Sequence, residues 1–265
     1  MEHNKAISRL SLFLSVMLIS SFVNVKAESN HKWKLVFSDP MTGKWQKNWF
    51  LDGEVVEVNN NKDGLTIWGG PEILNDAHHG VLWTKKEFTG DIRIEYDYTR
   101  LDTMLNLTAV TILYVHAQGD EAPGNPADIT KWSDERKIPA MKTYFNRMNS
   151  YHISYAAAEP SKDKKTSVDY IRARRYNPAL KSGLKGTDFS AEYLNNNLFK
   201  VGVKYHISFI LDGDKIYFIV KGDGKEVVCA FDRTEHPGLE KGRIGLRHMY
   251  TRGARYENFK VYEKK

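Results

Sequence analysis

The residues that could do chemistry gather between Thr143 and Arg175. His152 lies in a run of alternating polar and apolar residues, and Tyr170 opens a second run of the same kind. A period of two places alternate side chains on opposite faces of a β-strand, so each run predicts one packed face and one polar face. The polar face would combine imidazole, hydroxyl and guanidinium groups, which suits a sugar-binding cleft. The charged segment 159–165 would join the two strands.

Elimination at a uronic acid requires a base, an acid that protonates the leaving oxygen, and donors that neutralise the carboxylate. Histidine titrates near neutral pH and suits the first role. We expect His152 to be the base or the carboxylate partner, and Tyr170 to be the proton donor. Arg172 and Arg174 would clamp the carboxylate. Further candidates on adjacent strands are His116 for catalysis and Gln118, Tyr114 and Asn146 for substrate binding.

Each of these side chains also has a structural interpretation, as a hydrogen-bonded histidine, a half-buried tyrosine or a solvated strand arginine. Two other functions remain open. A glycoside hydrolase needs two carboxylates, and Glu95 and Asp97 share a strand face, although they could instead form cross-strand ion pairs. A non-catalytic carbohydrate-binding module would stack aromatic residues on sugars.

Metal binding has a weak signal in the sequence. His78 and His79 are adjacent, so on a strand they would point in opposite directions and could not chelate one ion. Asp120, Glu121 and Asp128 could hold calcium in a long loop, but acidic loops are more often simply solvated. We therefore expect no metal site and no cofactor, with calcium as the alternative.

The first 27 residues have the features of a cleaved secretory signal peptide. Lys5 and Arg9 form a basic start, residues 10–23 are largely apolar, and residues 25–27 resemble a cleavage site. The apolar run is too short and too often interrupted by serine for a transmembrane helix. We expect a secreted or periplasmic mature chain, residues 28–265, without a membrane span.

Charge and cysteine content restrict the partners. The chain carries a formal net charge of +6, and the leader, with three basic residues and one acidic residue, accounts for two of these charges. The mild basic excess that remains suits an acidic poly- or oligosaccharide and is too weak to indicate nucleic acid. The single cysteine, Cys229, lies in an apolar run and predicts a buried, inert thiol without a disulfide. Nothing in the sequence predicts an oligomeric state.

The mature chain contains about a dozen short strand-like runs separated by turn residues, and we find no long helical period. Residues 91–99 alternate cleanly between apolar and charged side chains. Segments 119–142 and 176–198 are predicted to be irregular. The pattern predicts an all-β fold, an antiparallel β-sandwich of the jelly-roll type, as a single domain over residues 28–265.

Several segments together resemble the concanavalin A-like lectin/glucanase jelly roll, namely residues 35–39, 211–214, 242–247 and 256–261. The central segments 150–155 and 170–175 resemble the YesU-like family, a domain of unknown function in bacterial proteins that is often associated with the breakdown of uronic-acid polysaccharides. The resemblance covers nearly all of the mature chain. Together with the candidate residues it implies a carbon–oxygen lyase acting on a saccharide such as ulvan or pectin. The leaving group could be a glycosidic oxygen, as in a polysaccharide lyase, or a hydroxyl, as in an oligosaccharide dehydratase.

Overall fold

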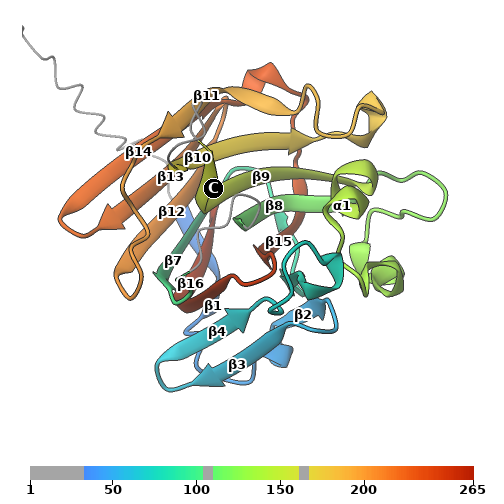
Figure 1. Cartoon of the computed structure of the whole chain (residues 1–265). Helices are drawn as coiled ribbons and strands as arrows, with labels where there is room; N and C mark the ends of the chain where they lie inside the picture. The colour runs from blue at the N-terminus through green and yellow to red at the C-terminus, as the bar shows by residue number, and fades with distance from the viewer. Residues whose placement is uncertain (1–32, 104–109, 161–166) are drawn as a thin grey trace, which may run out of the picture. The chain divides into compact units, whose positions relative to one another are not determined.

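The structure, a computed structural model, describes residues 33–103, 110–160 and 167–265. Within these residues the chain forms two eight-stranded antiparallel sheets that pack face to face (Figure 1). Sheet A has the strand order β14-β13-β12-β7-β16-β4-β3, and β1 pairs with β16. Sheet B has the order β11-β10-β9-β8-β15-β5-β2, and β6 pairs with β15. The predicted antiparallel β-sandwich is confirmed.

The elements have the following bounds. Sheet A comprises β1 (Trp33–Asp39), β3 (Glu57–Asn61), β4 (Gly64–Trp68), β7 (Ile92–Arg100), β12 (Lys204–Asp212), β13 (Lys215–Gly222), β14 (Lys225–Asp232) and β16 (Gly253–Lys264). Sheet B comprises β2 (Trp49–Asp52), β5 (Gly80–Thr84), β6 (Phe88–Thr89), β8 (Thr111–Gly119), β9 (Met148–Pro160), β10 (Ser167–Tyr176), β11 (Asp188–Leu194) and β15 (Lys241–His248). The helix α1 spans Met141–Arg147, and the short 3-10 helices are η1 (Trp45–Lys47), η2 (Asp76–His78), η3 (Ile129–Arg136), η4 (Pro178–Leu180) and η5 (Arg233–Glu235).

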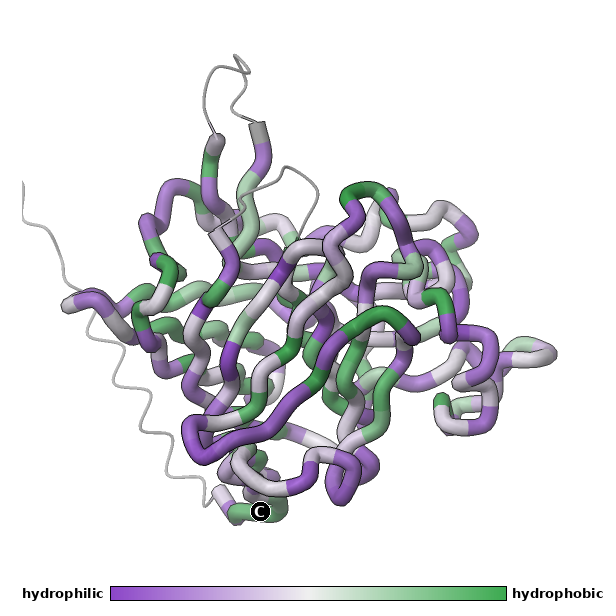
Figure 2. The backbone as a smooth tube through the Cα atoms, turned by 60° about the horizontal axis from the view of Figure 1, so that its bottom comes forward, coloured by the Kyte–Doolittle hydropathy of each residue, from purple (hydrophilic) through white to green (hydrophobic). Residues whose placement is uncertain are grey.

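Alternation of apolar and polar residues builds the core between the sheets. On β7 the alternate residues from Ile92 to Tyr98 are fully buried, as their spacing predicts. On β9 the odd-numbered residues from Tyr151 to Tyr155 face the same core. Figure 2 shows hydrophobic and hydrophilic residues alternating along the strands. Each large apolar side chain buried in this way stabilises the fold by roughly 1.5–3 kcal/mol.

A second apolar cluster covers the outer face of sheet B. Tyr144 of α1 and Trp132 of η3 belong to this cluster. The prediction of an irregular segment over 119–142 is therefore wrong, since it contains η3 and the start of α1. Asp128 begins η3 by accepting a hydrogen bond from the Thr130 backbone N–H at 3.1 Å. The polar residues of β9 are consequently buried, and His152 is only 1% exposed.

The other irregular segment, 176–198, contains β11, which pairs with the edge of β10. Cys229 is buried in the sandwich core, and burial raises the pKa of its thiol to about 12, so the predicted inert thiol is confirmed. Among the described residues, no helix is long and apolar enough to cross a membrane. The expected signal peptide, residues 1–27, lies outside the described residues.

Candidate functional site

A row of side chains crosses the outer face of sheet B, and His152 lies within it. His152 on β9 is paired with Tyr114 of β8 on one side and with Arg174 of β10 on the other. Tyr114 is paired with Gly245 of β15, which is paired with Trp83 of β5. In strand order this His152 row is Phe50, Trp83, Gly245, Tyr114, His152, Arg174 and Asp188. Strand pairing thus gathers residues from distant parts of the chain into one line.

A second row runs beside the first, two residues further along the strands. Strand β15 contributes Arg247 to this second row and Gly245 to the His152 row. In strand order this Arg247 row is Asp52, Val81, Arg247, Ile112, Ser154, Arg172 and Glu192. Side chains two residues apart on a strand share a face, so the two rows form one surface.

Gly245 makes room for the Trp83 indole in the His152 row. A Cβ atom at Gly245 would lie 2.4 Å from a carbon of the Trp83 ring. Because that space is free, Trp83 stacks on Tyr114 with a ring-centroid distance of 5.4 Å. Tyr144 of α1 stacks against both rings, at 6.3 Å from Trp83 and 5.8 Å from Tyr114. The helix is thereby placed over the row by aromatic packing.

We expect Gly245→Ala to lower the free energy of unfolding by roughly 1–3 kcal/mol, the usual cost of overpacking a core. Trp83 is fully buried and cannot move aside without disturbing its stack. Urea denaturation would measure the change. Gly43→Ala is the matched control, because nothing lies within 4 Å of a Cβ atom at that position. Equal stability of the two variants would contradict this account of Gly245.

The helices η3 and α1 form a cover over the two rows, and a buried ion pair also fastens this cover to sheet B. The Asp52 Oδ2 atom accepts hydrogen bonds from Arg136 Nε at 2.6 Å, Trp83 Nε1 at 2.7 Å and the Tyr144 hydroxyl at 3.0 Å. Burial raises the pKa of Asp52, while the Arg136 guanidinium acts to lower it. Arg136 and Asp52 are both fully shielded from solvent, so removing either partner would leave an uncompensated buried charge. The cover over the two rows is therefore held at its η3 end.

His152 is buried without a hydrogen-bond partner. Neither ring nitrogen has one among the described residues. The ring centroid lies 5.7 Å from that of Tyr114 and 4.9 Å from that of Tyr176. Burial lowers the pKa of His152 well below its usual 6.5, and the positive charges of Arg174, Arg247 and Arg172 act in the same direction. His152 is thus a neutral imidazole with one acceptor and one donor that no described residue uses.

Arg247 supplies unused donors to the same surface. Its Nη2 atom donates to the Pro139 carbonyl at 2.6 Å and lies 2.9 Å from His79 Nδ1. Its guanidinium carbon lies 4.7 Å from the centroid of the Tyr144 ring. Its Nε and Nη1 atoms are buried and form no hydrogen bond of good geometry in the described part of the chain. The Tyr114 hydroxyl interacts with both Arg247 and the Tyr176 hydroxyl. Guanidinium N–H groups that are not hydrogen-bonded within the protein can donate to an anionic group such as a carboxylate.

The two predicted clamp arginines differ in their partners. Arg172 bonds to both Glu192 and Glu159, and its guanidinium lies 4.5 Å from the centroid of the Tyr170 ring. Its charge is therefore already compensated. Arg174 pairs with Asp188 alone, at 2.8 Å, and its Nε atom is unpartnered among the described residues. Its side chain is 17% exposed, so Arg174 lies between the buried His152 and the solvent.

Tyr170 is not beside His152. It pairs with Ala157 of β9, beyond a bulge that separates it from Arg172. The hydroxyl-bearing rings in contact with His152 are instead those of Tyr114 and Tyr176. Burial raises the pKa of both tyrosines, so each hydroxyl keeps its proton at neutral pH.

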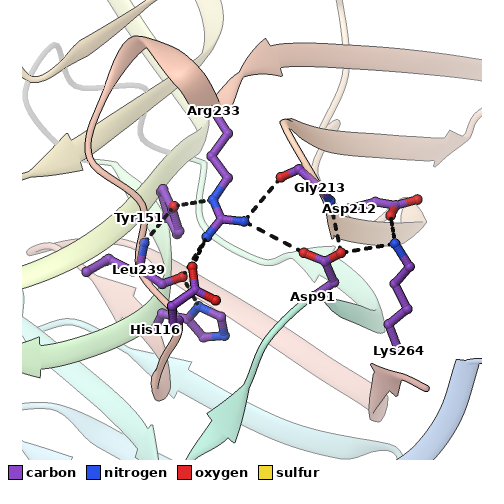
Figure 3. Close-up of polar contacts among 9 residues, drawn as sticks. Asp91, His116, Tyr151, Asp212, Gly213, Arg233, Leu239 and Lys264 are labelled. Carbon is purple, nitrogen blue, oxygen red and sulfur yellow. Dashed lines mark hydrogen bonds and ion pairs between the residues drawn. The ribbon is translucent and has the colours of Figure 1, made fainter.

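His116 lies away from His152 because β8 bulges after Val115. The backbone of His116 has a φ of +52°, and its Nδ1 atom lies 3.1 Å from the Leu239 carbonyl oxygen. It borders a network centred on Arg233, which donates to the Tyr151 hydroxyl at 2.8 Å and to the Leu239 carbonyl at 3.0 Å (Figure 3). The expected placement of His116 across a cleft from His152 is wrong for this reason.

The remaining predicted residues lie elsewhere. Asn146 is exposed on α1 and is not on a strand, so its expected place on the polar strand face is wrong. Gln118 pairs with Asn149 at the far end of β8, past the bulge. Of the residues predicted from sequence, the structure brings Tyr114, His152 and Arg174 together.

The alternative acidic pair has ordinary partners. Glu95 pairs with Arg93 at 3.2 Å, and Asp97 accepts hydrogen bonds from Asn258 and lies 2.8 Å from His206 on the next strand. Glu95 and Asp97 therefore form ion pairs on the outer face of sheet A, which is the structural alternative that the sequence analysis gave for them. No group of three metal-binding side chains occurs within residues 33–103, 110–160 and 167–265. Asp128, one of the candidate calcium ligands, bonds instead to Thr130 and Arg243.

With this geometry in view, the comparisons with known proteins decide the family. A protein family described as a domain of unknown function, DUF1961, matches residues 34–261. The chain belongs to the DUF1961 family. No curated protein matches this DUF1961 chain.

The solved structures that resemble this DUF1961 protein include three with lectin-like or galectin-like folds. A protein of unknown function with a galectin-like fold from Bacillus subtilis has a TM-score of 0.66 at 18% identity, over 88% of this chain and 98% of that one. The exoplasmic/lumenal domain of VIP36 has a TM-score of 0.54 at 12% identity, over 86% and 89%. A legume lectin-like domain from Entamoeba histolytica has a TM-score of 0.53 at 8% identity, over 86% and 96%. At these identities the likeness shows the fold alone, and it confirms the predicted lectin-like jelly roll.

Proposed function

We propose that this DUF1961 protein binds an acidic saccharide on the outer face of sheet B and catalyses β-elimination, as a carbon–oxygen lyase. The observation that carries the proposal is His152, a buried neutral imidazole with both nitrogens unpartnered among the described residues and with arginines and tyrosines around it. The resemblance of segments 150–155 and 170–175 to the YesU-like family supports a uronic-acid substrate. The lectin-like folds of the structural neighbours, one of them solved with Man3GlcNAc, support a saccharide.

The groups of the two rows fit the steps of the reaction. The neutral His152 would take the proton from the carbon next to the carboxylate, and Arg247 and Arg174 would stabilise the negative charge that develops there. The electron pair of the broken C–H bond would form the carbon–carbon double bond as the adjacent C–O bond breaks. The hydroxyl of Tyr176 or Tyr114 would protonate the leaving oxygen.

The position of His152 favours the end of a chain over its middle. His152 lies beneath the cover formed by η3 and α1, and Arg174 is the neighbouring member of its row that reaches solvent. Because His152 is only 1% exposed, a saccharide end that enters beside Arg174 would reach it only after the covering side chains move aside. A dehydratase or a lyase that acts on oligosaccharide ends agrees with this arrangement.

Ultraviolet absorbance during incubation with uronate substrates tests the proposal. The panel contains intact and pre-cut ulvan, pectin and alginate, and we expect absorbance from the conjugated double bond to rise fastest with the pre-cut oligosaccharides. Product masses then distinguish loss of water from loss of a sugar. New reducing ends without absorbance would indicate hydrolysis, for which Glu95 and Asp97 are the candidates. Retention on a saccharide gel without any product would indicate a binding module.

The two clamp arginines offer a matched pair of variants on one strand. We expect Arg174→Gln to raise KM about tenfold or more, since a hydrogen bond to a charged group contributes about 1.5–3 kcal/mol. We expect Arg172→Gln to change KM less than threefold, because Glu159 and Glu192 already compensate that charge. Initial rates from product absorbance would measure both. The reverse order of effects would place the carboxylate on Arg172 instead.

A further inference from the structure

A pocket of about 410 Å³ lies away from the two rows, on sheet A at the end of β4. It is lined by Val55, Glu57, Trp68, Gly69, Gly70, Pro71 and Thr251. A half-buried tryptophan thus lies beside a carboxylate, a hydroxyl residue and bare backbone. None of these lining residues is basic, so the pocket offers no positive charge of its own to an anion.

Trp68 presents one face of its ring to the pocket because Gly253 supports the other. Gly253 is the cross-strand partner of Trp68 on β16. A Cβ atom at Gly253 would lie 2.3 Å from two carbons of the indole ring. The ring therefore lies flat on the backbone of β16, as Trp83 lies on Gly245 in sheet B, but here the outer ring face lines a pocket. A fixed, flat aromatic surface is suited to stacking against the C–H face of a pyranose ring.

The wall beside Trp68 is held by backbone hydrogen bonds. The N–H groups of Gly69 and Gly70 donate to the carbonyls of Arg252 and His78 at 2.8 and 2.9 Å. The Thr251 N–H donates to the Gly70 carbonyl at 2.8 Å. A wall fixed in this way loses little conformational entropy when a ligand binds.

Thr251 lines the same pocket in a strained backbone conformation. Its backbone has a φ of +61°, a left-handed conformation that is strained for a β-branched residue. Its hydroxyl oxygen is buried and has no hydrogen-bond partner among the described residues. Strained residues and unsatisfied polar atoms both concentrate at functional sites.

We propose that this pocket binds a neutral hexopyranose unit, which stacks on Trp68 and hydrogen-bonds through its hydroxyls to Glu57. The carboxylate of Glu57 accepts hydrogen bonds from sugar hydroxyls and would repel a uronate. The binding site is thus different in place and in preferred sugar from the site around His152, and it does not depend on the chemistry proposed there.

Affinity electrophoresis of the full chain tests this proposal, in native gels that contain laminarin, galactomannan or arabinogalactan. We expect retardation in at least one gel and none with polygalacturonate. Trp68→Ala should weaken the apparent affinity at least tenfold, and Glu57→Gln, which removes the carboxylate charge, at least threefold. Trp33→Ala is the matched control, because Trp33 is also half-buried but pairs with the other end of β16, at Lys264.

Several outcomes would overturn the proposal. They are the absence of retardation in all three neutral gels, unchanged retardation of Trp68→Ala, and an equal loss in Trp33→Ala. Retardation by polygalacturonate alone would also overturn it. Glu57→Gln keeps the size of an exposed side chain, so it still tests the proposal if Trp68→Ala folds poorly; an unchanged affinity in Glu57→Gln would also overturn it.

Discussion

Replacing His152 with phenylalanine is expected to abolish the formation of unsaturated product while leaving the protein folded and close to the wild type in stability. Loss of a general base typically costs 10²–10⁴-fold in rate. Stability should persist because neither imidazole nitrogen has a partner among the described residues, so no observed hydrogen bond is lost. Phenylalanine also has a flat ring and is apolar, which suits a side chain packed against Tyr114 and Tyr176. Its larger ring adds an overpacking cost that offsets part of this gain.

Product absorbance and urea denaturation of the same variant measure the two effects. His116→Phe is the matched control, because His116 is also fully buried but bonds to the Leu239 carbonyl far from the two rows. That variant should lose stability and keep turnover wherever it remains folded. A stable, active His152→Phe protein would remove His152 from the mechanism. An unstable, inactive one would indicate a structural role for the imidazole.

Local patterns predict the sandwich well because burial between two sheets imposes a period of two. The alternation of β7 and of the odd positions of β9 predicts the buried face, and the structure confirms it. The same pattern cannot show what lies on the other face. The polar side of β9 would be exposed in a bare sheet, but α1 and η3 cover it, and their apolar residues occur in a segment with no clear helical period.

The site depends on strand order, which the sequence does not display. Arg247 belongs to a segment, 242–247, that resembles a fold motif, and its approach to His152 follows from β15 pairing with β8. Trp83 is brought near by β5 on the far side of β15. Tyr176, at the end of β10, could have been predicted from the sequence, because it continues the even-numbered positions of Arg172 and Arg174 on one face of the strand. The prediction for His116 is wrong because a bulge after Val115 changes the face of the strand on which its side chain lies.

Acidification from pH 7 to pH 5 is expected to remove most of the stability of the folded protein. Four histidines, all at most 1% exposed, are involved within the described residues: His79, His116, His152 and His248. Burial lowers the pKa of His79 to about 3, that of His116 to about 4 and that of His248 to about 3. It lowers the pKa of His152 well below 6.5 as well.

The direction of the effect follows from proton binding. In the unfolded chain these histidines take up protons near pH 6.5, whereas in the folded chain they stay neutral to much lower pH. The unfolded state therefore binds more protons throughout this range, and the free energy of unfolding falls as the pH falls. Each buried histidine contributes roughly 2 kcal/mol between pH 7 and pH 5, and four together approach the total stability of a typical domain. His206, whose pKa Asp97 raises, opposes the loss in part.

Urea denaturation at pH 7.5, 6.5, 5.5 and 5.0 measures this dependence, and the His152→Phe protein shows the share of one histidine. Its stability relative to the wild type should rise on acidification, because it lacks one of the groups that gain a proton on unfolding. His206→Gln, which removes an exposed histidine whose pKa is raised by its hydrogen bond to Asp97, should instead make the acid loss steeper. The neutral form of His152 persists below pH 6.5 in the folded chain, so activity should fall together with the folded fraction. A decline in activity near pH 6.5 without unfolding would instead mean that His152 titrates normally and is open to solvent.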